Sequence, residues 1–354
     1  MPHCVSQSRG QPQAKTNIHT FCALAQVPAI LAPWLDRLYE PEEISWILSH
    51  LRPDSGILDL SLSPAADPDF IQRMLQRGVL ERDAHGTLCI TPFYVRFEIW
   101  ALFEGWKDIP SEVRSKVLEL ELTRYIHGQR DGLQCLRQGR LPDRHWVRPY
   151  SILHSEALAL LEHIPHIYLW PCNCRLMMRG CSKPVYTCLR FDNERNLGWE
   201  ISTHRAQEIA HWAHSQGLMH CAEIGLDSKG SLRGALCNCC ADCCFPHALA
   251  EHEGVQGLFP LSRYQAVFTP ELCSGCKKCL RLCPFQALTL RPSRTGDEPV
   301  LEYHPSRCRG CGLCAWHCPT GALNMHKRDS QGLISQEVEE LFLLQNNTNK
   351  ATES

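Results

Sequence analysis

Apolar and polar residues in the first third of the chain alternate first with helical spacing and then with strand spacing. Apolar positions three or four residues apart predict helices over residues 42–51 and 68–77. Pro41 suits the first turn of the first helix, and Gly78 is placed to end the second. Two short apolar runs on either side of a turn at residues 83–86 predict a hairpin. Helices followed by such a hairpin describe a small winged-helix-like module.

The middle of the chain mixes helical and strand patterns. Amphipathic spacing predicts helices over residues 111–126, 155–163 and 204–216, and Thr203 is expected to cap the last of them. An apolar run at residues 167–170 predicts a buried strand, which ends directly before a group of cysteines. The predicted fold class is therefore α+β.

Cysteine content changes this picture. The chain has 22 cysteines in 354 residues. A disulfide framework belongs to short secreted chains, so thiols in this number predict a reducing compartment, the cytoplasm. No run of about 20 apolar residues is present that would span a bilayer. We interpret the apolar stretch at residues 21–35 as a docking arm or first helix rather than as a signal peptide.

Charge is unevenly distributed along the chain. Residues 36–106 carry twelve acidic side chains against six basic ones, whereas residues 266–328 carry nine basic against four acidic. The acidic balance of the first segment opposes phosphate contact, and its second helix offers only Arg73 and Arg77. A docking role is therefore favoured over DNA binding. The basic segment suits an acidic redox partner, or is an ordinary solvated face.

The C-terminal region spells one cysteine spacing twice. The copies are Cys273-x2-Cys276-x2-Cys279-x3-Cys283-Pro284 and Cys308-x2-Cys311-x2-Cys314-x3-Cys318-Pro319. Three thiolates at this spacing can wrap around three corners of a cubane cluster, and the fourth ligand comes from elsewhere. Structural zinc sites instead pair two CxxC knuckles across a longer gap. The repeat therefore predicts two iron–sulfur clusters and a protein that handles electrons.

This segment resembles the bacterial-type two-cluster ferredoxin domain over about residues 266–328. In that family the cysteine before proline binds the other cluster. The resemblance implies one [4Fe-4S] cluster held by Cys273, Cys276, Cys279 and Cys318, and a second held by Cys308, Cys311, Cys314 and Cys283. Gly275 and Gly310 are interpreted as positions where the backbone approaches inorganic sulfur. The stretch between residues 287–290 and 300–303 is predicted to be a hairpin extension.

A second cysteine-rich region precedes the ferredoxin segment. Its nine thiols are Cys172, Cys174, Cys181, Cys188, Cys237, Cys239, Cys240, Cys243 and Cys244. Soft thiolates select iron–sulfur units, zinc or copper(I). The leading interpretation is one or two further iron–sulfur clusters; zinc, a redox-active thiol centre and structural cysteines stay open. The five other cysteines are expected to be unligated: Cys4, Cys22, Cys89, Cys135 and Cys221.

Histidines accompany both cysteine regions. His204, His211, His214 and His220 lie on or just after the helix predicted at residues 204–216 and are expected to be exposed or to pack. His317 lies between Cys314 and Cys318, where it either couples proton uptake to reduction or is a solvent-facing loop residue. Its neighbour Trp316 is expected to pack.

The order of these segments also resembles a family of iron–sulfur binding proteins common in anaerobic bacteria, over about residues 36–328. The resemblance rests on the Cys172-x-Cys174-Arg175 block, the Cys237-Asn238-Cys239-Cys240 block and the ferredoxin segment. That family tends to have three consecutive cysteines after the second block, whereas here Cys243-Cys244 is followed by Phe245. One ligand of the family pattern is thus missing or replaced, which leaves the nuclearity of the central site open.

Together these patterns predict five segments. They are an N-terminal arm at residues 1–35, a winged-helix-like module at 36–105, a cysteine-rich α+β domain at 106–265, a ferredoxin-like dicluster domain at 266–328, and a C-terminal helix and tail at 329–354. The nucleotide, flavin and haem motifs are absent from the sequence. The leading hypothesis is an electron carrier or a subunit of a larger oxidoreductase complex. A reductase acting at the central cysteines and a redox-sensing regulator are the alternatives.

Overall fold

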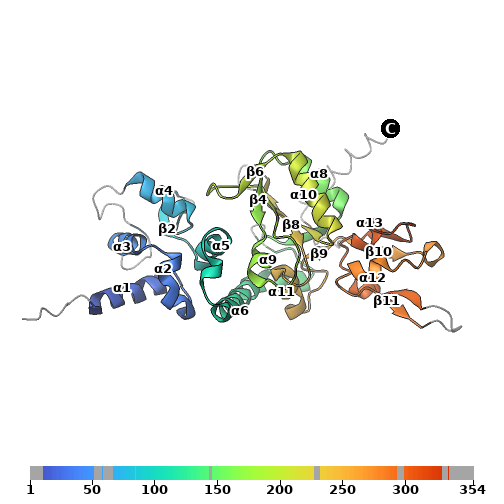
Figure 1. Ribbon diagram of the computed structural model, residues 1–354, viewed down its shortest axis with the longest axis horizontal. Coiled ribbons are helices and arrows are strands. Elements are labelled where there is room, and N and C mark those ends of the chain that lie inside the picture. Colours follow the sequence, from blue (N-terminus) through green and yellow to red (C-terminus); the bar gives the residue numbers. More distant parts are fainter. Residues whose placement is uncertain are drawn as a thin grey trace, which may run out of the picture. The chain divides into compact units, whose positions relative to one another are not determined.

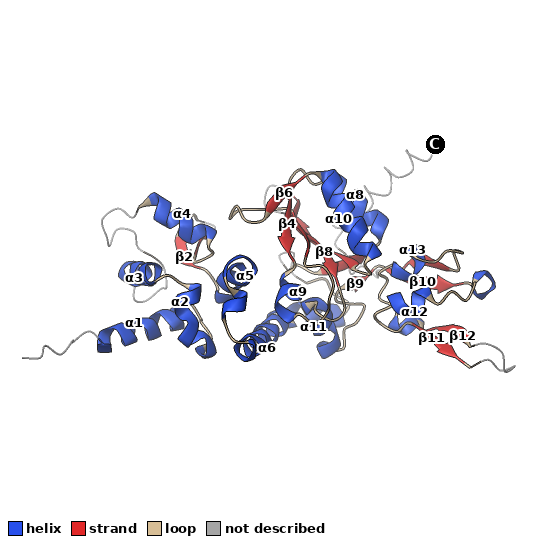
Figure 2. Ribbon diagram, in the orientation of Figure 1, coloured by secondary structure: helices blue, strands red, loops and turns tan. Residues whose placement is uncertain are grey.

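The computed structural model describes residues 11–51, 58, 67–83, 85–142, 146–226, 232–292, 299–328 and 334 (Figure 1). The chain divides into two compact units, one of Met1–Glu121 with Arg195–Leu197 and the other of Leu122–Glu194 with Gly198–Ser354. Most of the described strands belong to the second unit (Figure 2). None of the described helices is long and apolar enough to cross a membrane. The predicted C-terminal helix and Cys4 lie outside the described residues.

The first unit has its helices and hairpin where the sequence predicts them. Helix α3 (Pro41–His50) begins with proline in its first turn and carries a capping box. Helix α4 (Pro68–Gln76) is capped by Asp67, whose carboxylate accepts a hydrogen bond from the backbone N–H of Asp69 at 3.0 Å. Strands β1 (Leu80–Arg82) and β2 (Leu88–Ile90) pair antiparallel. The remaining elements are α1 (Gln11–Leu24), η1 (Ala29–Trp34), α2 (Leu35–Leu38), α5 (Phe93–Ile99), η3 (Trp100–Glu104) and η4 (Trp106–Asp108).

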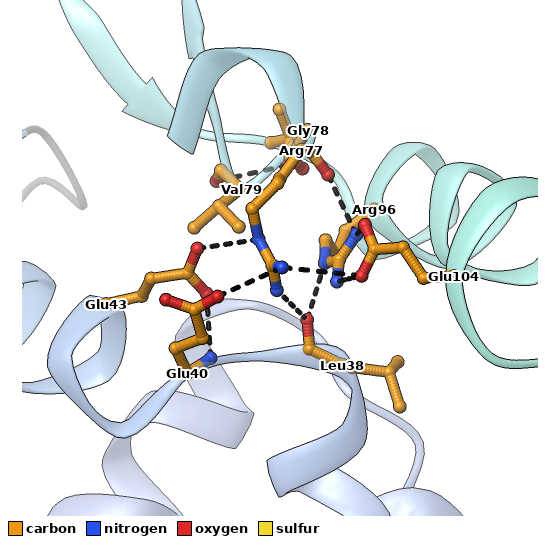
Figure 3. Close-up of polar contacts among 9 residues, drawn as sticks. Leu38, Glu40, Glu43, Arg77, Gly78, Val79, Arg96 and Glu104 are labelled. Atoms are coloured by element: carbon orange, nitrogen blue, oxygen red, sulfur yellow. Dashed lines mark hydrogen bonds and ion pairs between the residues drawn. The ribbon is translucent and has the colours of Figure 1, made fainter. Parts of the chain in front are cut away.

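Two arginines organise the interior of this unit (Figure 3). The side chain of Arg96 is fully buried and donates to both carboxylate oxygens of Glu104, at 2.7 and 2.6 Å. Arg77, at the end of α4, pairs with Glu43 at 2.9 Å and with Glu40 at 3.1 Å. Acidic neighbours therefore neutralise Arg77, one of the two basic residues that the second helix offers.

The second unit is built on a seven-stranded sheet with the order β6-β4-β5-β8-β7-β3-β9. The strands are β3 (Pro149–Ile152), β4 (Ile167–Pro171), β5 (Tyr186–Arg190), β6 (Trp199–Ile201), β7 (Met219–Leu226), β8 (Leu232–Cys239) and β9 (Leu261–Ser262). All neighbouring pairs are antiparallel except β3 and β9, which are parallel. The strand predicted at residues 167–170 is confirmed as β4.

Helices α8 (His154–Glu162) and α10 (Thr203–Ser215) share one apolar core with the sheet (Figure 1). Their small residues allow close packing, with Ala157 on α8 and Ala206 and Ala210 on α10 all fully buried. Before the ferredoxin segment this unit also contains α7 (Arg130–Arg137), α9 (Asn173–Met178) and α11 (Phe245–Glu253). Helix α6 (Ser111–Gly128) runs from the first unit into the second.

The three helices predicted in the middle of the chain are confirmed as α6, α8 and α10. The predicted cap of α10 is wrong by one residue. Ser202 is the N-cap, and its hydroxyl accepts a hydrogen bond from the backbone N–H of Arg205 at 3.2 Å, while Thr203 is already helical. Adjacent Ser and Thr are similar cap residues, so propensity alone does not choose between them.

The C-terminal part of the second unit is a duplication. Each half runs strand, 3-10 turn, cysteine loop, short helix, strand. The first half has β10 (Tyr264–Phe268), η5 (Pro270–Leu272), α12 (Lys278–Leu282) and β11 (Leu288–Arg291); the second has β12 (Val300–Tyr303), η6 (Pro305–Arg307), α13 (Leu313–Trp316) and β13 (Leu323–Lys327). β10 pairs with β13 and β11 pairs with β12, both antiparallel. The two halves therefore interlock, and the predicted hairpin extension is confirmed.

Candidate metal centres

The eight ferredoxin-type cysteines line two cavities. One is lined by Cys273, Cys276, Cys279 and Cys318. The other is lined by Cys283, Cys308, Cys311 and Cys314. Each cavity thus receives three thiols from one copy of the repeat and one, the cysteine before proline, from the other copy.

Left-handed backbone shapes both loops. Gly275 and Gly310 occupy equivalent places with φ values of +68° and +67°. A Cβ on Gly310 would lie 2.2 Å from the backbone oxygen of Tyr264, whereas one on Gly275 would meet no atom within 4 Å. Glycine is therefore required at residue 310 by close packing and at residue 275 by backbone conformation. Their approach to inorganic sulfur stays a prediction.

The chemistry of these cavities fits a cationic group bound by thiolates. Burial raises the pKa of Cys311 to about 12 and also raises the pKa of Cys314. Thiolates in such a place need a positively charged partner, and iron supplies one. Backbone N–H groups also donate to sulfur, from Ala266 to Cys308 and from Ala287 to Cys283, both at 3.4 Å. Such hydrogen bonds are typical of iron–sulfur ligands.

The two loops differ in exposure. In the first loop Cys276 is exposed, and the basic side chains of Lys277, Lys278 and Arg281 around it are exposed as well. In the second loop Cys308 and Cys311 are buried. The first cavity therefore lies at the surface and the second lies inside the unit.

The central cysteines form two sulfur groups. In the first group, the sulfur atoms of Cys181, Cys240 and Cys243 all lie within 4.8 Å of one another. The Cys181 sulfur is 3.6 Å from that of Cys240 and 3.7 Å from that of Cys243. Burial raises the pKa of Cys243 to about 12. Three thiols at these distances can bind one soft metal ion or one corner of a cluster.

The second group is a continuous series of interacting thiols. Cys172 interacts with Cys174, and Cys174 with Cys244. Cys244 in turn interacts with Cys239, which also meets Cys237. Cys237 finally meets Cys188 on β5. All nine predicted central cysteines therefore fall in one of the two groups.

Arg175, the arginine of the Cys172-x-Cys174-Arg175 block, ties the two cysteine blocks together. Its buried guanidinium donates to the backbone oxygen of Asn238 at 3.0 Å and to the hydroxyl of Thr187 at 2.7 Å. It also lies 3.8 Å from the sulfur of Cys240. A fixed positive charge among buried thiols favours their thiolate form.

A further thiol lies beside the central cysteines. Cys221, expected to be unligated, is buried on β7 directly opposite Cys237 of β8, and its lack of a metal stays a prediction. It interacts with Cys239, and this contact is the first cause that raises the pKa of Cys239 to about 12. The position of Cys221 opposite Cys237 is set by the register of the β7–β8 pair, which the sequence does not reveal. Of the other cysteines expected to be unligated, Cys22 and Cys89 lie in the first unit and Cys135 lies in α7.

The second ferredoxin loop is buried together with thiols of this centre. Cys311 and Leu313 share one buried cluster with Cys221, Cys239 and Cys244. No such contact with the central cysteines is described for the ligand loop at residues 273–279. The unit thus places the inner ferredoxin cavity next to the central sulfur atoms.

The histidines divide between the two expected roles. His204 and His211 are exposed, whereas His214 and His220 are fully buried and pack against His154 of α8. His154 was not singled out in the sequence. Its position depends on the packing of α8 against α10, which no local pattern encodes. Trp316 is 43% exposed and sets its ring edge against these histidines.

Comparison with known families agrees with this geometry at the C-terminal end. The model of the 4Fe-4S dicluster domain family matches residues 272–322, which include all eight cysteines of the two repeats. The chain therefore contains a ferredoxin-type domain that binds 4Fe-4S clusters and serves iron–sulfur electron transfer. No curated protein matches the chain.

Proposed function

We propose that the protein is an electron relay with two [4Fe-4S] clusters in its ferredoxin domain and a further iron–sulfur centre among the central cysteines. The cavity linings support the crossed ligand sets: Cys273, Cys276, Cys279 and Cys318 for the outer cluster, and Cys308, Cys311, Cys314 and Cys283 for the inner one. When bound, each cluster would accept and release one electron at a time. The fold orders the three sites from the exposed ferredoxin loop, through the inner loop, to the central cysteines.

The single observation that carries this proposal is the buried cluster that Cys311 shares with the central thiols. Cys311 belongs to the inner ferredoxin loop, and Cys239 and Cys244 belong to the central group, yet they share one buried cluster. Met219 and Leu313 belong to the same cluster and are buried, so water is excluded from it. A buried cluster that joins two sulfur-rich sites is what a relay requires.

The outer ferredoxin loop supports entry from a partner protein. Its exposed cysteine is surrounded by the basic residues Lys277, Lys278 and Arg281. Such a face attracts an acidic donor or acceptor and raises its encounter rate. We therefore expect an acidic redox partner, and a place for this chain within or beside a larger oxidoreductase complex.

Metal analysis after anaerobic purification tests the relay. About 8 irons per chain would confine iron to the ferredoxin domain, and about 12 or 16 would indicate one or two central clusters. About one zinc per chain would indicate a structural zinc centre instead. If the chain holds about 12 or 16 irons, a Cys172→Ser, Cys174→Ser variant should lose the central iron and its EPR signal. A matched Cys135→Ser control keeps every iron; equal iron in the wild type and the double variant contradicts the central cluster.

A reductase acting at the central cysteines is the second candidate. The observation that favours it is the trio of Cys181, Cys240 and Cys243, because three protein ligands leave one coordination position of a four-coordinate metal open. Turnover of a disulfide by the reduced wild type, lost in Cys240→Ser but kept in Cys135→Ser, would establish this activity.

For the first unit we propose docking rather than DNA binding, within a winged-helix-like module. Its acidic balance and the ion pairs of Arg77 with Glu40 and Glu43 support this choice. A redox-sensing regulator would retard promoter DNA at low salt, where phosphate contacts are strongest.

The thiol-rich composition supports a reducing cytoplasm, since all 21 cysteines of the described residues are free of disulfides.

A further inference from the structure

A cluster of buried histidines lies beside the inner ferredoxin loop, separate from the sulfur groups. It joins His154 at the start of α8, His214 on α10 and His220 on β7. One ring nitrogen from each lies within 4.8 Å of the other two. His154 is 9% exposed and the other two are fully buried. Three elements of the second unit thus each bring one histidine to the same small space.

His214 has no hydrogen-bond partner for either ring nitrogen, although its side chain is fully buried. Buried polar atoms are nearly always satisfied, so this pair of nitrogens indicates a missing ligand. The neighbouring rings stack nearly parallel on His214, at centroid distances of 4.7 Å for His154 and 4.9 Å for His220. Stacking leaves the in-plane lone pairs of the three rings available.

His220 is held in the orientation that metal-binding histidines adopt. Its Nδ1 lies 2.8 Å from the side-chain oxygen of Asn238, whose amide nitrogen donates to the backbone oxygen of Thr187 at 2.6 Å. The amide is thereby fixed with its oxygen toward the ring, so the ring donates from Nδ1 and keeps a lone pair on Nε2. That Nε2 faces the Nδ1 of His154 at 3.0 Å. A hydrogen bond from the far ring nitrogen to a protein oxygen is the usual second contact of a metal-bound histidine.

We propose that His154, His214 and His220 form a site for a divalent transition-metal ion of the class that prefers imidazole, such as Zn²⁺ or Fe²⁺. Two nitrogens bound to one tetrahedral zinc ion are about 3.3 Å apart, given Zn–N distances near 2.0 Å. The 3.0 Å pair of His154 and His220 needs only a small separation to admit the ion. Burial lowers the pKa of His154 to about 4 and that of His220 to about 3, so both rings are neutral ligands at physiological pH.

The site has a route to solvent and an open coordination position. His211 lies 3.2 Å from the other ring nitrogen of His154, is exposed, and lines a groove of about 1200 Å³ between α8 and α10. Three histidines with one position left for water or a small ligand is the arrangement of catalytic rather than structural metal sites. Trp316, between two ferredoxin cysteines, has its ring 5.1 Å from that of His214. A metal held here would therefore lie beside the inner ferredoxin cavity.

The test uses the full chain, purified without oxygen and reconstituted with iron and sulfide before one equivalent of Zn²⁺ is added. We expect about one zinc to be retained after desalting, and X-ray absorption at the zinc edge to show nitrogen at about 2.0 Å with imidazole scattering. In His214→Gln, zinc affinity should fall at least tenfold with iron and sulfide unchanged. His204→Gln, an exposed position on the same helix, is the matched control and should bind zinc like the wild type.

Three results would overturn the site. The wild type could retain no zinc, which would leave the rings as a metal-free hydrogen-bonded cluster. The zinc could show sulfur at about 2.3 Å, which would assign it to the central cysteines. His214→Gln could keep wild-type affinity. Because the absorption spectrum is taken on the wild type, the proposal is tested even if the variant does not fold. Its failure is distinct from failure of the relay, which depends on iron.

Discussion

The two halves of the ferredoxin domain have the same cysteine spacing and the same order of elements, but they lie in different surroundings. The first loop exposes Cys276 among lysines, and the second buries Cys308 and Cys311 against the central cysteines. Sequence duplication therefore produced two chemically similar sites, and packing made one of them a surface site and the other an interior site. The domain therefore has one exposed site and one buried site, an asymmetry that the repeated cysteine spacing does not contain.

The largest expected effect is on iron content, in two single variants that each remove one cluster ligand, one in each half. Cys276→Ser and Cys311→Ser should each lower iron by about 4 per chain, because each removes one cubane cluster. Only Cys311→Ser should also alter the EPR signal of the central centre, since Cys311 shares a buried cluster with Cys239 and Cys244 and Cys276 does not. Cys89→Ser, in the first unit, is the control for loss of a thiol. Equal effects of the two ligand variants on the central signal would break the comparison.

Glu156 at the start of α8 holds Tyr264, whose backbone packs closely on Gly310 of the inner loop. Its carboxylate accepts from Arg263 at 2.8 Å and from the hydroxyl of Tyr264 at 2.7 Å, and all three side chains are buried or nearly so. Glu156→Gln leaves Arg263 with a buried charge, so we expect a loss of about 3–5 kcal/mol in the free energy of unfolding. Denaturant unfolding measures this.

In the same Glu156→Gln variant, iron from the inner half should be lost to a chelator faster than in the wild type. Glu208→Gln, on the exposed side of α10, should behave like the wild type. An unchanged rate of iron loss in Glu156→Gln would show that this contact does not protect the inner half.

The glycines of the two loops provide a smaller contrast. Gly310→Ala places a Cβ 2.2 Å from the backbone oxygen of Tyr264 and keeps a left-handed φ, so it should cost about 3 kcal/mol. Gly275→Ala meets no atom and should cost about 1 kcal/mol for the backbone conformation alone. Thermal unfolding of the two variants side by side measures the difference. A larger loss for Gly275→Ala would contradict the assignment of packing to the second loop.

The smallest effect concerns the charge of the outer face. A Lys277→Glu, Lys278→Glu variant should accept electrons from an acidic donor protein about tenfold more slowly at low ionic strength. The difference should vanish at high salt, because exposed charges are screened. Stopped-flow reduction measures the rates, with Arg205→Glu on α10 as the control for a reversed surface charge. A salt-independent difference would indicate damage to the cluster rather than lost steering.

The sequence was most informative where function depends on neighbours in the chain. The ligand loops are local, so the spacing of Cys273 to Cys283 predicts them directly, and Pro41 predicts the start of its helix. The neighbours of Cys221 and His154 were not predicted, because they are set by strand register and helix packing. Both are contacts between residues more than a dozen positions apart in the chain. A strand residue such as Cys221 has the same local signature whether its face meets sulfur or an aliphatic core.

The pairing of β10 with β13 has a consequence for how the protein is made. The first strand of the duplicated domain finds its partner only at Leu323–Lys327, close to the end of the chain. During synthesis, both ligand loops are therefore made before the strand that closes this sheet. A premature stop codon anywhere before residue 323 would remove β13 and leave β10 without its partner, although β11 and β12 would both be present whenever the stop falls after residue 303.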